Sequence, residues 1–289
     1  MKMKPIATIA AVSLLSLVST GWSASMIQNK GSDTLVNVAQ ALAEEYQKVK
    51  PEVAIAVTGG GSGTGIAALL NGTVDIANSS RQIEQKEVKL AEKNNIHPKE
   101  LTIGFDALGV FVHKSNPLKE ISLAQLARMY GDGGDVNNWK QLGVEVPGCK
   151  GQKIILISRQ NNSGTYEYFR EAVLHKKDFI MGTRDMHGSK DVVDLVGKTP
   201  CAIGYSGMAY ADETTKMLAI KKEDSSAAVV PSMETAVDKT YPIARPLFMY
   251  TNGEPTGEIK AYLDWIMAKD GQCLVSKKGY APAKPVPCK

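Results

Sequence analysis

Three strand–turn–helix units constrain the fold of this chain more than any other feature. In each unit a short apolar run is followed by a turn of small polar residues and then by the spacing of an amphipathic helix. The turns lie at 31–35, 59–65 and 158–165. Strands that alternate with helices predict α/β lobes with largely parallel sheets, in which ligands bind beyond the strand ends and against helix N-termini.

The third turn is the most polar and reads Ser158-Arg159-Gln160-Asn161-Asn162-Ser163-Gly164-Thr165. It follows the apolar run 153–157 and precedes a predicted helix that begins near Thr165. The first N–H groups of a helix have no partner inside it, and the helix dipole favours negative charge there. Hydroxyls and a guanidinium in the same turn therefore predict a site for a tetrahedral oxyanion. The alternative is an ordinary capped helix with Arg159 on the surface.

Two long extended runs indicate how the lobes are joined. The runs 101–112 and 241–250 bracket the middle of the chain and are typical of two crossovers between lobes. Further strands are expected over 27–30, 53–58, 74–77 and 203–206. Helices are expected over 38–49, from Ile66 onward, and over 84–93, 123–130, 190–196 and 257–267.

The first 25 residues have the pattern of a secretory leader. Met1 to Lys4 carries positive charge, 6–18 is apolar without a charge, and cleavage is plausible after Ser23 or Ser25. The apolar segment is shorter than the roughly 20 residues of a membrane span. We therefore expect an exported, soluble protein, without a lipid anchor because no cysteine lies near the cleavage sites.

The charge balance limits the kind of partner. Loss of Lys2 and Lys4 with the leader lowers the formal net charge from +4 to +2. No run of Lys and Arg is interleaved with aromatic residues, so the sequence argues against nucleic acid as a partner.

Four cysteines remain in the exported chain: Cys149, Cys201, Cys273 and Cys288. In an oxidising compartment an even number of cysteines indicates disulfides, and four cysteines allow three pairings. We favour Cys149–Cys201 and Cys273–Cys288, the second of which would close a short C-terminal loop. The spacing of cysteines and histidines predicts no zinc site, and no cofactor is expected.

The glycine turn at 59–65 matches none of the common catalytic or nucleotide motifs. Gly65 is followed by Ile66 rather than by the Lys of a P-loop, and the dinucleotide fingerprint lacks its third glycine. A hydrolase elbow around Ser62 lacks its second glycine as well. The four histidines stand in no motif, so no nucleophile is found with a base. The motifs therefore give no support for catalysis.

With these turns located, nearly the whole mature chain resembles the periplasmic phosphate-binding proteins of bacterial ABC phosphate transporters, the PstS family. The resemblance is carried by Gly31-Ser32-Asp33-Thr34-Leu35, Gly59 to Gly65, Tyr130-Gly131-Asp132 with Asn138-Trp139, Arg159-x-x-x-Ser163-Gly164-Thr165, and Tyr241 to Tyr250. The spacing of Arg159 and Ser163-Gly164-Thr165 is the most specific of these.

The resemblance implies a two-lobed periplasmic binding protein fold of type II-like form, with two α/β domains joined by two hinge strands. Lobe I would comprise 26–104 and 246–289, and lobe II 105–245. It further implies a monomer that captures inorganic phosphate between the lobes and delivers it to an inner-membrane ABC transporter permease.

The resemblance also assigns residues to the phosphate. Arg159 would hold the phosphate oxygens as a bidentate fork, while hydroxyls and backbone N–H groups of the turns donate to the rest. The expected phosphate-binding residues are Ser32, Thr34, Leu35, Ser62, Gly63, Ser80, Arg81, Arg159, Ser163, Gly164 and Thr165. Arg81 is either a ligand or a charge at the rim that speeds association.

One departure from the family pattern concerns selectivity. Many members have an Asp in the turn after the fourth strand, where it accepts the proton of hydrogen phosphate. Here that turn is Asn78-Ser79-Ser80-Arg81 and has no carboxylate. Without such a carboxylate, a site no longer repels a fully ionised anion such as sulfate.

Other functions therefore stay open at this point. Sulfate, molybdate or tungstate are alternative ligands of the same binding class. An exported phosphate-ester hydrolase, or a signalling protein on the same fold, is an alternative of a different class.

Overall fold

The computed structural model describes residues 25–288. The leader expected over 1–25 lies outside the described residues except for Ser25. None of the described helices is long and apolar enough to cross a membrane.

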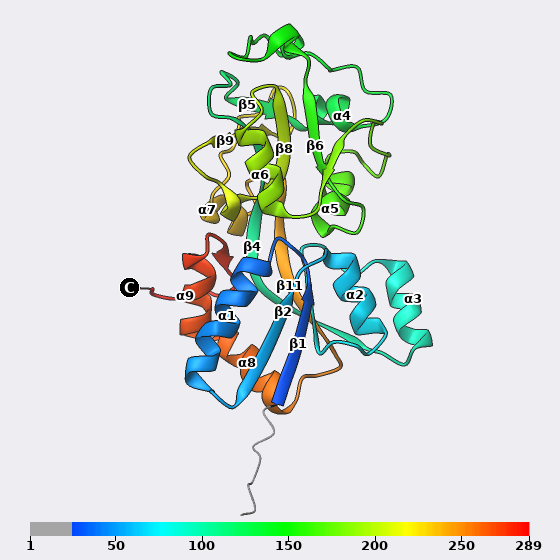
Figure 1. The fold of residues 1–289 in the computed structure, drawn as a ribbon, viewed down its shortest axis with the longest axis vertical. Coiled ribbons are helices and arrows are strands. Elements are labelled where there is room, and N and C mark those ends of the chain that lie inside the picture. The colour runs from blue at the N-terminus through cyan, green and yellow to red at the C-terminus, as the bar shows by residue number, and fades with distance from the viewer. Residues whose placement is uncertain (1–24, 289) are drawn as a thin grey trace, which may run out of the picture.

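One twisted sheet runs through the whole molecule, with β4 and β11 in its middle (Figure 1). The strand order is β2-β1-β3-β11-β4-β8-β6-β7. β4 (Pro98–His113) is 16 residues long because it serves both lobes. It pairs antiparallel with β11 (Ala244–Asn252) over its first part and with β8 (Ala202–Gly207) over its second. The predicted two-lobed α/β fold is thus confirmed, and both expected crossovers are strands.

In lobe I, helices cover both faces of the sheet (Figure 1). Strand β1 pairs in parallel with β2 and with β3, and helices α1, α8 and α9 pack on one face while α2 and α3 lie on the other. Its elements are β1 (Ser25–Gly31), α1 (Val36–Val49), β2 (Val53–Thr58), α2 (Ser62–Leu70), β3 (Ile76–Ser79), α3 (Gln85–Lys93), α8 (Gly257–Met267), α9 (Lys269–Lys277) and β12 (Ala281–Pro282).

In lobe II, β6 pairs in parallel with β7 and β8, and a small separate sheet is formed by β5 and β10. Lobe II contains β8 and shares β4 with lobe I. Its other elements are β5 (Glu120–Ser122), α4 (Leu123–Tyr130), β6 (Ile155–Arg159), α5 (Gly164–Ala172), β7 (Arg184–Met186), α6 (Ser189–Gly197), β9 (Thr215–Met217), β10 (Ala219–Lys221), α7 (Met233–Val237) and the short 3₁₀ turns η1 (Trp139–Leu142), η2 (Lys150–Gln152) and η3 (Met208–Tyr210).

Each lobe has a core of its own. In lobe II, Trp139 is fully buried, and the Phe169 ring stacks on Tyr205 with 4.0 Å between centroids. In lobe I, the apolar spacing predicted for α1 places Leu42 and Tyr46 inside, where Tyr46 contacts Tyr262 of α8. Because the two cores do not merge, the lobes can move as separate bodies about the strands that join them.

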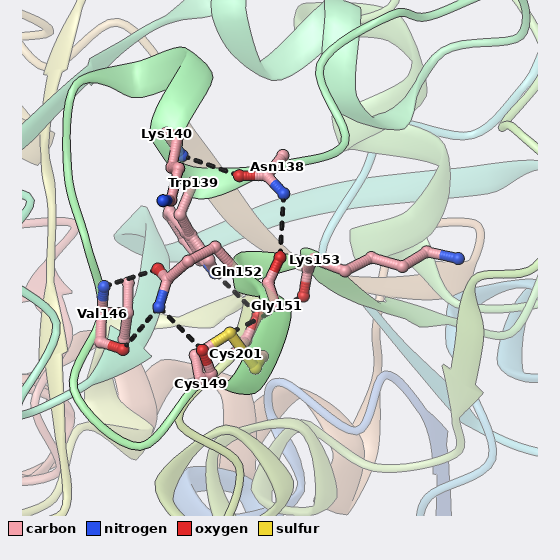
Figure 2. The surroundings of a disulfide bond; sticks show 9 residues. All are labelled: Asn138, Trp139, Lys140, Val146, Cys149, Gly151, Gln152, Lys153 and Cys201. Carbon is pink, nitrogen blue, oxygen red and sulfur yellow. Dashed lines mark hydrogen bonds between the residues drawn. A yellow bond between two sulfur atoms is a disulfide. The ribbon is translucent and has the colours of Figure 1, made fainter.

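Both disulfides join the cysteines that the sequence analysis paired. Cys149–Cys201 fastens the η2 segment to the start of β8, and Gln152 beside it holds the loop through hydrogen bonds to Val146 and to the Cys149 carbonyl (Figure 2). Cys273–Cys288 ties the C-terminal segment to α9.

Several features of the fold differ from the expectations. Strand β3 covers 76–79 instead of 74–77, so Asn78 and Ser79 lie in a strand and not in a turn, and helix α7 was not predicted. Helix α2 begins at Ser62, so half of the expected glycine turn is helical. Helix α9, which follows α8 after a single extended residue, was not predicted from the sequence. The expected boundaries at 104/105 and 245/246 fall within β4 and β11, and they stay a prediction because these strands belong to both lobes.

Candidate functional site

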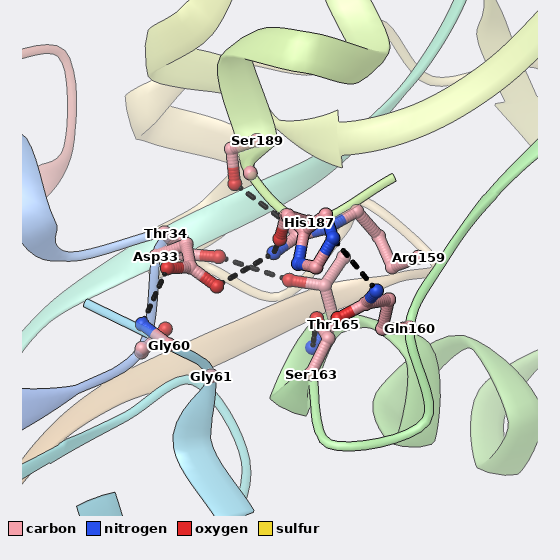
Figure 3. Close-up of polar contacts among 12 residues, drawn as sticks. Asp33, Thr34, Gly60, Gly61, Arg159, Gln160, Ser163, Thr165, His187 and Ser189 are labelled. Carbon is pink, nitrogen blue, oxygen red and sulfur yellow. Dashed lines mark hydrogen bonds and ion pairs between the residues drawn. The ribbon is translucent and has the colours of Figure 1, made fainter. Parts of the chain in front are cut away.

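Three helices begin at one place, where the lobes meet. Helices α1 and α2 follow β1 and β2 of lobe I, and α5 follows β6 of lobe II. Thr34 Oγ1 and Thr165 Oγ1 lie 2.9 Å apart across the interface (Figure 3). In addition, the Gly63 N–H donates to the Asn162 carbonyl over 3.0 Å. The helix N-termini thus converge, as the oxyanion hypothesis requires.

A cluster of three serine hydroxyls lies on the lobe I side. Ser80 Oγ is 3.0 Å from Ser32 Oγ and 3.4 Å from Ser62 Oγ, and Ser62 Oγ also accepts the Ser80 N–H. All three side chains are buried. They come from the ends of β1 and β3 and the start of α2, so three separate segments supply one group of hydroxyls.

Gly164 faces this cluster from lobe II. A Cβ atom at this position would lie 2.2 Å from Ser62 Oγ and 2.8 Å from Ser80 Oγ, which is far closer than atoms can approach. The start of α5 can approach the serines this closely only because the residue is glycine.

Ser163 caps helix α5. Its Oγ accepts the N–H groups of Thr165 and Tyr166 at 3.1 and 3.4 Å. Because a hydroxyl has one proton besides its two lone pairs, Ser163 retains a donor for a further partner.

Arg159 is fully buried at the end of β6 (Figure 3). Its Nη1 donates to Ser189 Oγ at 2.9 Å, and its Nη2 donates to the His187 carbonyl at 2.7 Å. Burial lowers the pKa of Arg159 from its usual value and the nearby Asp33 opposes this; an arginine stays protonated in either case. The alternative interpretation, in which Arg159 lies on the surface, is therefore wrong.

Asp33 is a site residue that sequence reasoning did not select. Its Oδ2 accepts Arg159 Nη2 at 3.0 Å, and its Oδ1 accepts the Gly60 N–H at 2.8 Å. The turn 78–81 has no carboxylate, and Asp33 in the first turn places one where the lobes meet. It joins the glycine turn of lobe I to the arginine of lobe II.

Arg81, Gly63 and Leu35 have other partners in this structure. Arg81 forms a two-pronged ion pair with Glu87, with N–O distances of 2.7 and 2.8 Å. Burial tends to lower the pKa of Arg81, but Glu87 together with Glu84 and Glu167 raises that pKa above its usual value. Gly63 N–H donates to Asn162, as described above, and Leu35 N–H donates to the Ser32 carbonyl at 3.0 Å.

A second buried guanidinium borders the site from the crossovers. Arg245 of β11 pairs with Asp106 of β4 at 2.8 Å, and both side chains are fully buried. Burial raises the pKa of Asp106, whereas Arg245 and the Met208 N–H lower it. Sequence reasoning missed this pair because Arg245 stands in an apolar run and shows no motif.

Among the described residues, no group of three or more His, Cys, Asp or Glu side chains is placed to hold a metal ion. The three serine hydroxyls contact one another and backbone groups, and the imidazole ring of His187 pairs with the Gln160 side chain. The geometry therefore suits the binding of an anion through oriented donors.

Two α/β lobes on shared strands, with helix N-termini meeting between them, define a two-lobed solute-binding protein. Residues 18–270 match the family model of the PBP superfamily domain. The phosphate-binding protein PstS of Pseudomonas aeruginosa is 35% identical over 267 residues, covering 89% of this chain and 82% of that protein. The protein SphX of Synechococcus elongatus is 33% identical over 290 residues, covering 96% and 83%.

Solved structures agree with these matches. A phosphate ABC transporter substrate-binding protein with bound phosphate from Clostridium perfringens has a TM-score of 0.79 and 27% identity, covering 90% of this chain and all of that one. An ABC-type phosphate transport receptor from Vibrio cholerae has a TM-score of 0.69 and 26% identity with the same coverage. The chain belongs to the PBP superfamily and, within it, to the PstS family of phosphate-binding proteins.

Proposed function

We propose that this protein captures inorganic phosphate between its lobes and delivers it to an ABC transporter permease of the inner membrane. The observation that carries the proposal is the meeting of the α1 and α5 starts at Thr34 and Thr165, beside the buried Arg159. Relatives named for phosphate binding and the bound phosphate of the Clostridium structure support it.

The donors divide into two groups. Ser163, Thr165 and Arg159 act from lobe II, while Thr34 and the three serine hydroxyls act from lobe I. The proposed set is the expected one: Ser32, Thr34, Leu35, Ser62, Gly63, Ser80, Arg81, Arg159, Ser163, Gly164 and Thr165. The N–H groups of Leu35 and Gly63 donate to backbone carbonyls here, and they would have to leave these partners to donate to an anion. Both terminal nitrogens of Arg81 are bound to Glu87, so Arg81 would attract the anion only through its positive charge.

The lobes close by bending at β4 and β11, which shifts the equilibrium between an open and a closed form. Lobe I comprises residues 26–104 and 246–289, and lobe II comprises residues 105–245. The contacts of Asn162 with both Gly60 and Gly63 across the interface support a closed form in which the lobes touch. Phosphate favours this form because only there do both groups of donors surround it.

Asp33 supports phosphate over sulfate, molybdate or tungstate as the ligand. Its negative charge offsets that of Arg159, so a bound anion meets a site with a lower net positive charge. A carboxylate at the edge of the site disfavours a fully ionised anion and can accept a hydrogen bond from the hydroxyl of hydrogen phosphate.

We further propose where the protein acts, in which assembly state, and that it catalyses no reaction. The protein is a monomer of the periplasm, exported by its leader and without a nucleic-acid partner. It is not an enzyme, because the site offers donors for an anion and no base beside a nucleophile.

A thermal-shift panel on protein stripped of bound ligand tests the capture of phosphate. Ligands that bind only the folded state raise the melting temperature in proportion to their affinity. We expect the largest shifts with phosphate and arsenate. A larger shift with sulfate or molybdate, or no shift with any oxyanion, would overturn the proposal.

Incubation with a chromogenic phosphate ester separates binding from hydrolysis. We expect no sustained turnover. Turnover that Ser163→Ala abolishes would show an enzyme and contradict the transport function.

A further inference from the structure

Arg245 and Asp106 form the most deeply buried ion pair at the junction of the lobes. The two residues lie opposite each other in the antiparallel register of β11 and β4, so each crossover supplies one partner. Both Nε and Nη2 of Arg245 donate to Asp106 Oδ2, at 3.0 and 2.8 Å. The other carboxylate oxygen accepts the N–H of Met208, in η3 of lobe II, at 3.0 Å.

The guanidinium also reaches two segments of the anion site. Arg245 Nη2 lies 3.3 Å from Thr34 Oγ1, and Nη1 donates to the Ser80 carbonyl at 3.2 Å. Its central carbon lies 5.5 Å from the centre of the Tyr168 ring, on the same helix as Thr165. Arg245 therefore contacts the first turn, the end of β3 and helix α5 at once.

The chemistry of the guanidinium fixes the direction of one hydrogen bond. An arginine side chain donates and never accepts. Thr34 Oγ1 must accept from Arg245, and its own proton is directed away from the guanidinium. The nearest polar atom on that other side is Thr165 Oγ1, at the centre of the site.

We propose that Arg245 is a positioning residue for the bound anion: it makes the Thr34 hydroxyl a donor toward the anion, and Asp106 holds it in place. This inference rests on the proposed phosphate function, and it names the residue that fixes the direction in which the Thr34 hydroxyl donates. In this role Arg245 acts through the Thr34 hydroxyl and does not itself contact the anion.

A purely structural role for the pair gives a different expectation. If Arg245 only fastens β11 to β4, its replacement weakens binding by the same factor whether or not the Thr34 hydroxyl is present. If it acts through that hydroxyl, the two effects are coupled and do not multiply.

A double-mutant cycle on the full-length protein distinguishes these roles. Phosphate affinity is measured by calorimetry for the unmodified protein, Arg245→Lys, Thr34→Val and the double variant. Lysine keeps the positive charge but has no planar fork with which to bind Asp106, Thr34 and Ser80 together. We expect Arg245→Lys to weaken binding about tenfold, as for a hydrogen bond from a charged group, and by less than about twofold in the Thr34→Val background.

The matched control is Arg128→Lys, whose ion pair with Asp135 lies on the surface with both side chains more than half exposed. We expect it to leave phosphate affinity unchanged. If Arg245→Lys does not fold, the neutral pair Arg245→Gln with Asp106→Asn takes its place in the cycle, since it leaves no buried charge unpaired.

Equal losses in both Thr34 backgrounds, or no loss from Arg245→Lys, would overturn the positioning role. Absence of phosphate binding by the unmodified protein would instead overturn the proposed function, so the two failures are distinguishable.

Discussion

The carboxylate of Asp33 and the guanidinium of Arg159 meet at 3.0 Å, although the two residues belong to different lobes and are 126 positions apart. The Arg159 side chain is almost fully buried and that of Asp33 is 16% exposed. A charge pair of this kind joins the lobes at the place where the starts of α1 and α5 meet.

Replacement of Arg159 removes four donated hydrogen bonds and the buried partner of Asp33. We expect Arg159→Ala to weaken phosphate binding by about 3 kcal/mol or more, because a desolvated anion loses charged donors and Asp33 is left unpaired. Isothermal calorimetry on folded variant protein measures the change, with Arg170→Ala as the control, because the partly exposed Arg170 of the same lobe pairs with Glu167 and Asp178 and not with the site. Unaltered affinity would remove Arg159 from the site.

Asp33→Asn leaves the charge of Arg159 without its carboxylate. The substitution removes one negative charge, so the net charge of the site becomes more positive. We therefore expect the affinity for sulfate to rise relative to that for phosphate by about tenfold. Competition between the two anions in a thermal-shift titration measures the ratio. A ratio equal to that of the unmodified protein would show that Asp33 has no part in selectivity.

Gly164→Ala tests the close approach of α5 to the serine cluster. A methyl group would clash with Ser62 Oγ, whereas alanine is favourable within a helix. We expect lobe II to fold normally and the lobes to stop short of closure, with phosphate binding lost by at least about a hundredfold. Small-angle scattering with and without phosphate reports the closure, and the exposed Glu171→Ala of the same helix is the control. Tight binding by Gly164→Ala would contradict the site geometry.

Asn162 tests the contribution of contacts between lobes that do not touch the anion. Its amide donates to the Gly60 carbonyl at 3.1 Å, across the interface. Asn162→Ala removes this bond only in the closed form, so we expect phosphate to dissociate several-fold faster while association changes little. Stopped-flow measurement of the association and dissociation rates checks this expectation. A change in the association rate alone would contradict it.

The two disulfides should contribute to stability and not to binding. Cys273–Cys288 closes a loop of 15 residues, for which the chain-entropy model gives about 3 kcal/mol. We expect Cys273→Ser with Cys288→Ser to lower the melting temperature without altering phosphate affinity, because neither cysteine contacts the site residues. A large loss of affinity in folded variant protein would be inconsistent with this separation.

The sequence was sufficient to find the three turns, because apolar runs, small polar residues and helical spacing are local signals. It was not sufficient to find Asp33, since the orientation of that side chain depends on Gly60 and Arg159, which are brought to it by the fold. Arg245 likewise has a role only through Asp106 and Thr34, which are distant in sequence.

The start of helix α2 shows how tertiary contact outweighs local preference. Glycines predicted a loop through Gly65, yet Gly63 and Gly65 are helical. A side chain at Gly65 would lie 2.5 Å from the Lys30 carbonyl oxygen, so glycine there permits the helix to pack against β1. Helix α9 was missed because it follows α8 without a proline or other strong boundary signal.

The central position of β11 has a consequence for the order in which the protein folds. This strand lies between β3 and β4, although it is made long after both of them. The sheet of lobe I stays in two pieces until β11 is inserted, whereas β4, β6, β7 and β8 of lobe II are all synthesised earlier. We therefore expect lobe II to mature first during biosynthesis, and lobe I to depend on the arrival of the final segment.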